Sequence, residues 1–407
     1  MCQSHHHGCS RQTIIIPMSE LVRNQASVSE ETLLRQAMAA CRESGLSFAL
    51  WKLPNDGVLH FAASAEPARI KEVNLEETKA GFLFAPFDPG QDKIFLPADE
   101  FIRITAGAVE SLSGSLLSKH FPAPEAGPPP YFVRPLAEAH PVTPSSYQEL
   151  VRKCKDAVTG GTFEKLVPSR FQEVDLPSSF DPAAIFLALG QKYPQAMVSV
   201  FSSPETGTWI GATPEMLVSV DAHQRFKTVA VAGTQPYVTG TDLKTVTWTQ
   251  KEIEEQALVE RYIISCFKKI RLREFDEHGP RTVIAGNVVH LKTEFEVDMA
   301  ATRYPQLGSV MLQLLHPTSA VCGMPMEASL AFLQAHEGYA REFYSGYLGP
   351  VRVHGESHLF VNLRCMQVLE KKARLYAGGG VLGDSDPEKE WLETELKMRT
   401  LLNVIRP

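Results

Sequence analysis

The sequence predicts an α+β fold in which helices flank large antiparallel β-sheets. Segments rich in β-branched and large apolar residues dominate the middle of the chain. Segments with helical spacing do not alternate with them in the strict strand–helix order of a parallel sheet. The chain has 407 residues, 44% of them hydrophobic, so it can bury a sizeable core.

The expected helices are amphipathic and are spread along the chain. Leu150, Val151 and Cys154, for example, share one face of a segment that begins at Tyr147. The expected helices cover residues 31–44, 147–158, 250–271, 309–315, 326–335 and 388–403. The expected strands cover residues 48–53, 93–96, 166–167, 197–201, 209–210, 216–220, 227–231, 288–291 and 360–363.

The sequence becomes rich in proline in residues 121–144. Because proline cannot continue a helix or a central strand, we expect a connector here. It would separate a variable N-terminal region, residues 1–120, from the main body, residues 145–407, with both in one α/β assembly. A long surface loop within a single domain is an equally good interpretation.

Charge and composition argue against several classes of partner. The net charge is −7 and no long basic run occurs, which argues against nucleic acid or an anionic membrane as the main partner. No apolar run approaches the length of a membrane span. The seven cysteines are scattered without a CxxC motif, so we expect reduced thiols in a cytoplasmic protein.

The N-terminal tail holds consecutive histidines, His5 to His7, between Cys2 and Cys9. We interpret this tail as disordered, and a metal-binding tail is the alternative. The apolar run that follows, Ile14 to Ile16, is too short for a signal sequence.

Two pairs of glutamates indicate a divalent-metal site. Glu252 and Glu255 lie three residues apart in one expected helix, and Glu390 and Glu393 lie three apart in another. Residues with this spacing share a helix face, and Mg²⁺ prefers carboxylate oxygens completed by water and substrate oxygens. Each pair alone is more simply a solvated helix face. The glycine triplet at residues 378–380 favours a site, because glycine amides before a helix can hold an anion.

Eight motifs, taken together, resemble the chorismate-utilising enzymes. They occur in the order of that family between Tyr147 and Asn403, and chance agreement of all of them is negligible. The motifs are FEKLVPSR (163–170), GATPEML (211–217), VAGT (231–234), KEIEEQ (251–256), HL (290–291), LHPTSAVCGMP (315–325), HEGYAREFYSG (336–346) and GGGVLGDSDPEKEWLETELK (378–397). The resemblance implies a magnesium-dependent enzyme with the fold of anthranilate synthase component I, whose chorismate-binding catalytic domain covers residues 145–407.

Within this family the resemblance points to isochorismate synthase, an isomerase of menaquinone or siderophore biosynthesis. Water-using members carry lysine at the position of Lys165, and the loop LHPTSAVCG is similar to the isochorismate synthase version. The closest alternative is salicylate synthase, which makes isochorismate and then eliminates pyruvate. Lys165 argues against ammonia-using anthranilate or aminodeoxychorismate synthases. The intact Lys165, Glu215 and four glutamates argue against a silent binding protein.

The implied chemistry gives roles to two titratable residues. Isochorismate forms when water adds at C2 of the chorismate ring and the C4 hydroxyl leaves. We assign Lys165 as the base that activates the water and Glu215 as the acid that protonates the leaving oxygen. These roles require burial to lower the lysine pKa and to raise the glutamate pKa. The alternative to these catalytic roles is a structural one, in which Lys165 and Glu215 form an ion pair that only holds two strands together.

The remaining roles are carried over from the family to matching positions. Glu255 and Glu390 are expected to ligate Mg²⁺ directly, and Glu252 and Glu393 to act through water or as supporting groups. The residues expected to bind the substrate are Gly233, Thr234, His290, Tyr344, Arg364, Gly378, Gly380 and Lys397. Arg364 matches the family position for the enolpyruvyl carboxylate. The alternative for His290 is a histidine buried in the core that does not bind the substrate.

Three positions depart from the family pattern. Gln235 stands where many relatives have arginine, Gln256 where many have histidine, and Gly379 where alanine is usual. None of these departures removes a proposed catalytic group, although the first two weaken the assignments for substrate positioning. The resemblance also implies a monomer.

Overall fold

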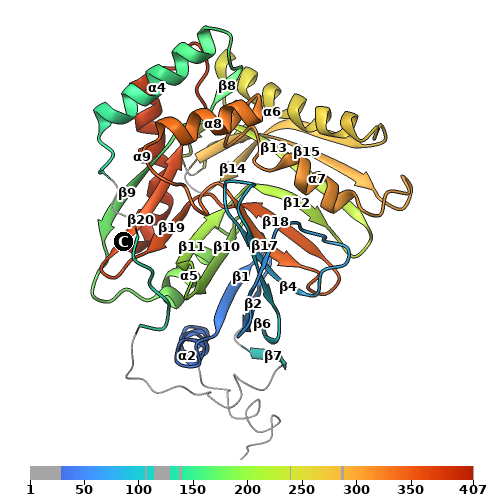
Figure 1. Cartoon of the computed structure of the whole chain (residues 1–407), viewed down its shortest axis with the longest axis vertical. Helices are drawn as coiled ribbons and strands as arrows, with labels where there is room; N and C mark the ends of the chain where they lie inside the picture. Colours follow the sequence, from blue (N-terminus) through green and yellow to red (C-terminus); the bar gives the residue numbers. More distant parts are fainter. Residues whose placement is uncertain are drawn as a thin grey trace, which may run out of the picture.

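The computed structural model describes residues 29–105, 108–113, 129–136, 140–238, 240–285 and 288–406. The histidine-containing tail and residues 121–128 and 137–139 of the expected connector therefore lie outside the described residues. The described chain forms large antiparallel sheets flanked by helices, which confirms the predicted fold class (Figure 1).

Two sheets of nine strands each dominate the fold, and strands from residues 47–113 take part in both. The first sheet has the order β7 (Ala108–Ser113), β6 (Glu100–Thr105), β2 (Val58–Ser64), β1 (Ser47–Lys52), β10 (Met197–Ser203), β11 (Gly207–Thr213), β19 (Cys365–Val368), β20 (Lys372–Gly378) and β9 (Ser169–Asp175). The second has the order β14 (Asp276–Ala285), β15 (Val288–Asp298), β13 (Arg225–Pro236), β12 (Met216–Val220), β18 (Ser357–Val361), β17 (Tyr347–Val351), β4 (Gly81–Ala85), β5 (Lys93–Pro97) and β3 (Ala68–Ile70). A small sheet pairs β16 (Gly323–Met324) with β8 (Lys165–Leu166).

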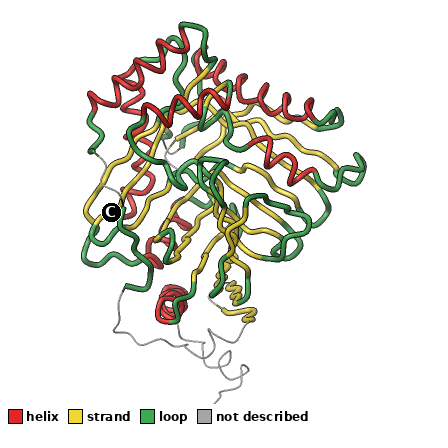
Figure 2. Tube along the Cα trace, viewed as in Figure 1, coloured by secondary structure: helices red, strands yellow, loops and turns green. Residues whose placement is uncertain are grey.

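The helices lie outside these sheets, as the red segments around the yellow strands show in Figure 2. They are α2 (Glu30–Glu43), α4 (Pro144–Thr159), α5 (Pro182–Lys192), the 3₁₀ helix η1 (Leu243–Thr245), α6 (Gln250–Lys269), α7 (Leu307–Leu315), α8 (Met326–His336) and α9 (Pro387–Ile405). In the view of Figure 1, α4, α8 and α6 run across the top of the molecule.

The two sheets pack face to face over an aromatic core. Trp51 and Phe201 of the first sheet contact Phe82 and Phe84 of the second, with ring centroids 5.1 and 4.6 Å apart. Apolar side chains of α2, α5 and α9 cover the outer face of the first sheet, and α6 and α7 cover the second. The core is therefore divided between one layer inside the sandwich and one on each side of it.

The helices that carry the glutamate pairs start at well-defined caps. Thr249 caps α6 and forms a capping box with Glu252. Asp386 caps α9, and Pro387 occupies its first turn. These caps fix the residue at which each helix begins.

Two of the links that carry the chain from one large sheet to the other are neighbours. Pro214 and Glu215 join β11 to β12, and residues 362–364 join β18 to β19. Each link is hydrogen-bonded to a strand beside the other link, since Val361 N of β18 donates to Glu215 O at 2.9 Å and Ala212 N of β11 donates to Arg364 O at 3.1 Å. The strand expected at residues 216–220 is β12, and Glu215 lies in the link before it, where Pro214 lacks the N–H that a strand ladder needs.

Cys41, Cys154, Cys266, Cys322 and Cys365 are buried and unpaired. In the described ranges, no helix is both long enough and apolar enough to cross a membrane.

Candidate active site

A cavity at the seam between the sheets collects most of the residues singled out in the sequence. The links contribute Glu215 and Arg364, and α6 and α9 contribute glutamates. The predicted site residues that line the cavity are Glu215, Gly233, Thr234, Glu255, His290, Tyr344, Arg364, Gly378, Gly380, Glu393 and Lys397. Lys165, Glu252 and Glu390 are not part of the lining.

Lys165 lies just behind the cavity wall and is completely buried. Its Nζ lies 2.9 Å from Oε1 of Glu255, an ion-pair distance, although within the described chain this nitrogen has no partner at hydrogen-bond angles. A Cβ at Gly380 would lie 2.8 Å from Lys165 Cε and would overlap Glu255 Oε1. Only glycine therefore lets the wall approach this pair so closely.

The ion pair of Lys165 is made with Glu255 and not with Glu215. Among the described residues no ion pair joins Lys165 to Glu215, so the strand-joining pair considered as an alternative is absent from this part of the chain. The cations Lys165 and Lys251 outweigh the effect of burial on Glu255 and hold its pKa below the usual value.

Glu215 is buried, with 7% of its surface exposed. Burial raises the pKa of its carboxyl to about 7, against the opposing effect of Lys165, Arg364 and Lys397. This shift has the direction that a general acid requires at neutral pH. A carboxyl with this pKa is protonated in a large fraction of molecules at neutral pH.

Glu390 is more deeply buried than its partners, with 1% exposure. Its Oε1 accepts a hydrogen bond from Lys251 Nζ at 2.5 Å. Burial, followed by the charge of Glu393, raises the Glu390 pKa to about 7. Glu393 pairs with Lys397 at 2.7 Å, and Lys397 Nζ also donates to Gly378 O at 2.8 Å.

The carboxylate of Glu252 is hydrogen-bonded at the start of its own helix. It accepts hydrogen bonds from Thr249 N at 2.7 Å and from Gln235 Nε2 at 2.9 Å. Gln235, one of the departures from the family pattern, is therefore bound to a glutamate. Gln256, another departure, is buried and donates to Thr293 Oγ1 at 3.2 Å and to Glu260 Oε1 at 3.1 Å.

The residues present fit a small divalent cation without forming a complete ligand set. In the part of the chain that the structure describes, no three His, Cys, Asp or Glu side chains converge as metal ligands. Mg²⁺ needs only one or two carboxylates when water and substrate oxygens complete its shell. Oε2 of Glu390 is buried without a partner among the described residues, and a Cβ at Gly379 would lie 2.8 Å from it. Glycine at this position thus keeps space beside a free carboxylate oxygen.

Arg364 is held in place by His290. Nδ1 of His290 lies 2.5 Å from Gly233 O, and its Nε2 lies 3.4 Å from Nη2 of Arg364. Burial, followed by the charge of Arg364, lowers the His290 pKa to about 3, so the ring is neutral. The contacts then require Nδ1–H to donate to Gly233 O and Nε2 to accept from Arg364. Burial raises the pKa of Tyr344, which stacks on Tyr376, to about 12.

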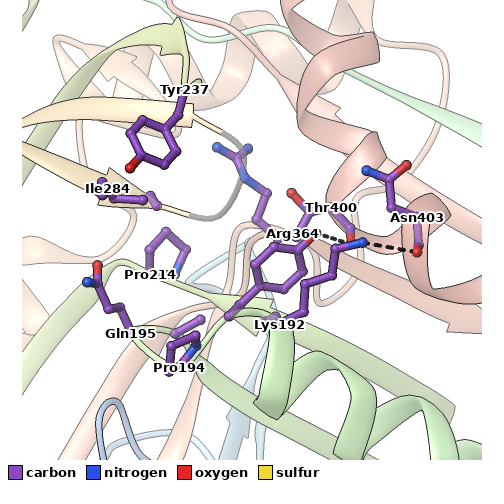
Figure 3. Close-up of a pocket in the computed structure, with 13 residues that line it drawn as sticks. Lys192, Pro194, Gln195, Pro214, Tyr237, Ile284, Arg364, Thr400 and Asn403 are labelled. Atoms are coloured by element: carbon purple, nitrogen blue, oxygen red, sulfur yellow. Dashed lines mark hydrogen bonds between the residues drawn. The ribbon is translucent and has the colours of Figure 1, made fainter. Parts of the chain in front are cut away.

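A second cavity of about 390 Å³ adjoins the first. Pro214 and Arg364 line both cavities, so Arg364 lies on the boundary between them. Figure 3 shows Arg364 extending among Pro214, Tyr237 and Thr400 on the side of this second cavity.

Comparison with known proteins supports the family suggested by the motifs. Residues 110–406 match the family described as chorismate binding enzyme. The chain belongs to this chorismate-binding family. The isochorismate synthase EntC of Escherichia coli (strain K12) is 25% identical over 265 residues, which cover 64% of this chain and 67% of EntC.

Solved structures of chorismate-binding enzymes share the fold. The menaquinone-specific isochorismate synthase MenF of Escherichia coli matches with a TM-score of 0.72 at 21% identity, covering 91% of each chain. Anthranilate synthase component I of Streptococcus pneumoniae matches with a TM-score of 0.63 at 17% identity, covering 87% of this chain and 89% of that one. The predicted fold of anthranilate synthase component I is thus confirmed.

Sequence reasoning missed charged residues that support the site. Lys251 binds Glu390, and Arg341 and Glu337 form a buried pair near Lys165. All three belong to motifs that the resemblance uses. The sequence alone carries no sign that these charges are paired inside the protein.

Proposed function

We propose that this chain is an isochorismate synthase that converts chorismate to isochorismate with Mg²⁺. The observation that carries the proposal is the buried Glu215 carboxyl, with a pKa of about 7, in a cavity whose wall covers the buried Lys165. A potential acid and a potential base thus lie at one cavity that also contains the cations Arg364 and Lys397. The relatives described above, EntC and MenF, are named isochorismate synthases.

Binding of chorismate requires cationic and N–H donors for two carboxylates. Arg364 is assigned to the enolpyruvyl carboxylate, because its guanidinium lines the cavity and can bind a carboxylate with two parallel hydrogen bonds. Tyr344 keeps its proton and assists as a donor. The ring carboxylate is assigned to the glycine segment at residues 378–380, with Gly233 and Thr234, which line the same cavity.

His290 is assigned to positioning and not to substrate contact. Both of its ring nitrogens are already engaged, one by Gly233 O and the other by Arg364. A neutral imidazole in this position orients Arg364 without adding a second positive charge.

Proton transfer is assigned to Lys165 and Glu215. Lys165 accepts a proton from the water that attacks C2, and Glu215 donates a proton to the C4 oxygen, which leaves as water while the ring double bonds shift. One water enters and one leaves, so the product is an isomer of the substrate. Proton return from Lys165 to Glu215 through solvent restores both groups.

Glu255 and Glu390 are assigned as the carboxylates that would hold Mg²⁺, with Glu393 in support. When bound, the ion would neutralise the ring carboxylate and favour attack on the ring. Glu252 contributes only through the start of α6, since its carboxylate is already bonded to Thr249 and Gln235.

The setting proposed for this reaction is a cytoplasmic monomer. Cys154, Cys322 and Cys365 are buried and unpaired in the described chain, which agrees with a reducing compartment. Size-exclusion chromatography with light scattering checks the monomer, and a dimer would refute it.

Product analysis tests the proposed function. The purified protein is incubated with chorismate and Mg²⁺ without ammonia, and the products are separated by chromatography. Isochorismate as the sole product supports the proposal. Salicylate with pyruvate would show a salicylate synthase instead, and turnover that needs ammonia would show an aminating enzyme.

A further inference from the structure

A buried ion pair lies beside the strand that carries Lys165. Nη2 of Arg341 lies 2.5 Å from Oε1 of Glu337, and the two side chains are only 3% and 2% exposed. Both residues follow α8 in the motif HEGYAREFYSG. Neither lines the cavity, so their charges serve something other than direct contact with a substrate.

The backbone next to Lys165 is irregular. β8 ends at Leu166 and β9 begins at Ser169, with Val167 and Pro168 between the two strands. Proline lacks an N–H and interrupts the strand ladder. Buried backbone groups at such an interruption need partners from elsewhere in the protein.

The Glu337–Arg341 pair supplies these partners. Arg341 Nη2 donates to Val167 O at 2.6 Å, and Ser169 N donates to Glu337 Oε1 at 2.8 Å. The hydroxyl of Ser169 donates to the same carboxylate oxygen at 3.0 Å. The ion pair therefore replaces the missing ladder bonds on both sides of Pro168.

Arg341 also reaches the other side of the Lys165 strand. Its Nη1 donates to Val321 O at 2.8 Å. Val321 belongs to the loop that leads into β16, where Met324 is the strand partner of Lys165. One guanidinium thus joins both segments that flank Lys165, and Val167 and Val321 line the cavity.

We infer that Glu337 and Arg341 are positioning residues that fix Lys165 at the cavity wall. This inference rests on the proposed role of Lys165 as the base. A buried ion pair adds little to stability when compared with an apolar pair of similar size. We therefore expect this pair to fix the positions of the segments that it joins. Proton transfer is sensitive to small displacements, and misplacement by about 1 Å can cost about 10²-fold in rate.

The test compares three forms of the pair. In Glu337→Leu/Arg341→Met both charges are removed, and we expect kcat to fall about 10²-fold. The KM for chorismate should change little, because Arg364 and Lys397 are untouched. In Glu337→Gln/Arg341→Lys some donors and acceptors remain, and kcat should recover in part. A purely structural role predicts lower thermal stability with kcat per folded molecule unchanged in both variants, which would overturn the inference.

A neighbouring ion pair provides a matched control. Glu342 follows Arg341 directly but pairs with Arg134 instead, and neither of these residues lines the cavity. Glu342→Gln/Arg134→Met should therefore leave kcat near the wild-type value. If the apolar double variant does not fold, Arg341→Lys alone decides: lower kcat at unchanged KM supports the inference, and unchanged kcat overturns it.

A crystal structure separates this inference from the proposed function. In a folded variant without the pair, Lys165 Nζ should move by about 1 Å or more from its place beside Glu255 Oε1. An unchanged distance of 2.9 Å would overturn the inference, whether or not the protein acts on chorismate. Absence of chorismate turnover in the wild-type protein would overturn the proposed function instead.

Discussion

Lys165 Nζ lies 2.9 Å from Oε1 of Glu255, so the lysine assigned as the base is ion-paired with a carboxylate assigned to the metal. Gly380 makes this contact possible, because any side chain there would collide with both residues. In the proposed mechanism, proton transfer and metal binding therefore share one carboxylate.

Replacement of Lys165 by alanine should stop water addition while leaving substrate binding largely intact. General-base catalysis contributes about 10²–10⁴-fold, so we expect kcat of Lys165→Ala to fall by roughly that factor. Mg²⁺-dependent chorismate binding, measured by calorimetry, should remain because Arg364 and Lys397 are present. Lys153→Ala, at an exposed position of α4, is the control. Unchanged turnover in Lys165→Ala would refute the base assignment.

Gly380→Ala should disrupt the contact between Lys165 and Glu255. The new Cβ would lie 2.8 Å from Lys165 Cε and would displace Glu255. We expect a loss of about 10²-fold in kcat and weaker Mg²⁺ binding in a metal titration. Gly383→Ala is the matched control, because its Cβ would meet only Thr159 Oγ1 at an ordinary 3.6 Å. Equal activity of the two variants would contradict the described packing.

Glu215 should make stability depend on pH. Its folded pKa of about 7 is above the ordinary value of 4.5, so well below pH 4.5 the carboxyl is protonated in both states and contributes no difference there. As pH rises through 4.5 towards 7, the unfolded state ionises first and the native state loses up to about 3 kcal/mol. Glu215→Gln removes this loss.

Denaturant unfolding at pH 5 and pH 8 measures this effect. From pH 5 to pH 8, the free energy of unfolding of Glu215→Gln should rise relative to that of the wild type. The free energy of unfolding of Glu149→Gln, a variant at an exposed residue, should not. The same carboxyl predicts that the wild-type kcat declines above about pH 7 as the acid ionises. A parallel pH dependence for Glu215→Gln and wild type would show that Glu215 is not the shifted group.

Arg364→Lys should weaken substrate binding more than turnover. Lysine cannot reproduce the planar pair of donors that suits a carboxylate, nor the contact with His290 Nε2. A hydrogen bond to a charged group is worth about 1.5–3 kcal/mol, so KM for chorismate should rise roughly 10- to 100-fold. Arg225→Lys, in an exposed ion pair with Asp298, controls for the loss of a guanidinium. An unchanged KM would remove Arg364 from the substrate site.

Much of the helical fold could be predicted because the relevant periodicity is clear. The helix expected at residues 147–158 is α4 (Pro144–Thr159), and the one expected at 388–403 is α9 (Pro387–Ile405). α5 (Pro182–Lys192) was missed, because apolar residues surround its axis and no polar face marks the 3.6-residue period. Strands such as β4 were missed for a similar reason, since all of its residues are buried.

The site was predicted less completely, and the misses have a physical pattern. The motifs identified side chains that point into the cavity, such as Glu215 and Arg364. They did not reveal that Glu252 completes the capping box of its own helix, or that Lys251 binds Glu390. A sequence shows which charges exist, whereas their pairing depends on segments that meet only in the folded chain.

Isotope incorporation tests the central claim most directly. The protein is incubated with chorismate and Mg²⁺ in ¹⁸O-labelled water, and isochorismate is examined by mass spectrometry before it equilibrates with chorismate. Because water is expected to add at C2 while the C4 oxygen leaves, the product should carry one solvent oxygen, located at C2. Isochorismate without the label would contradict water addition assisted by Lys165 and Glu215.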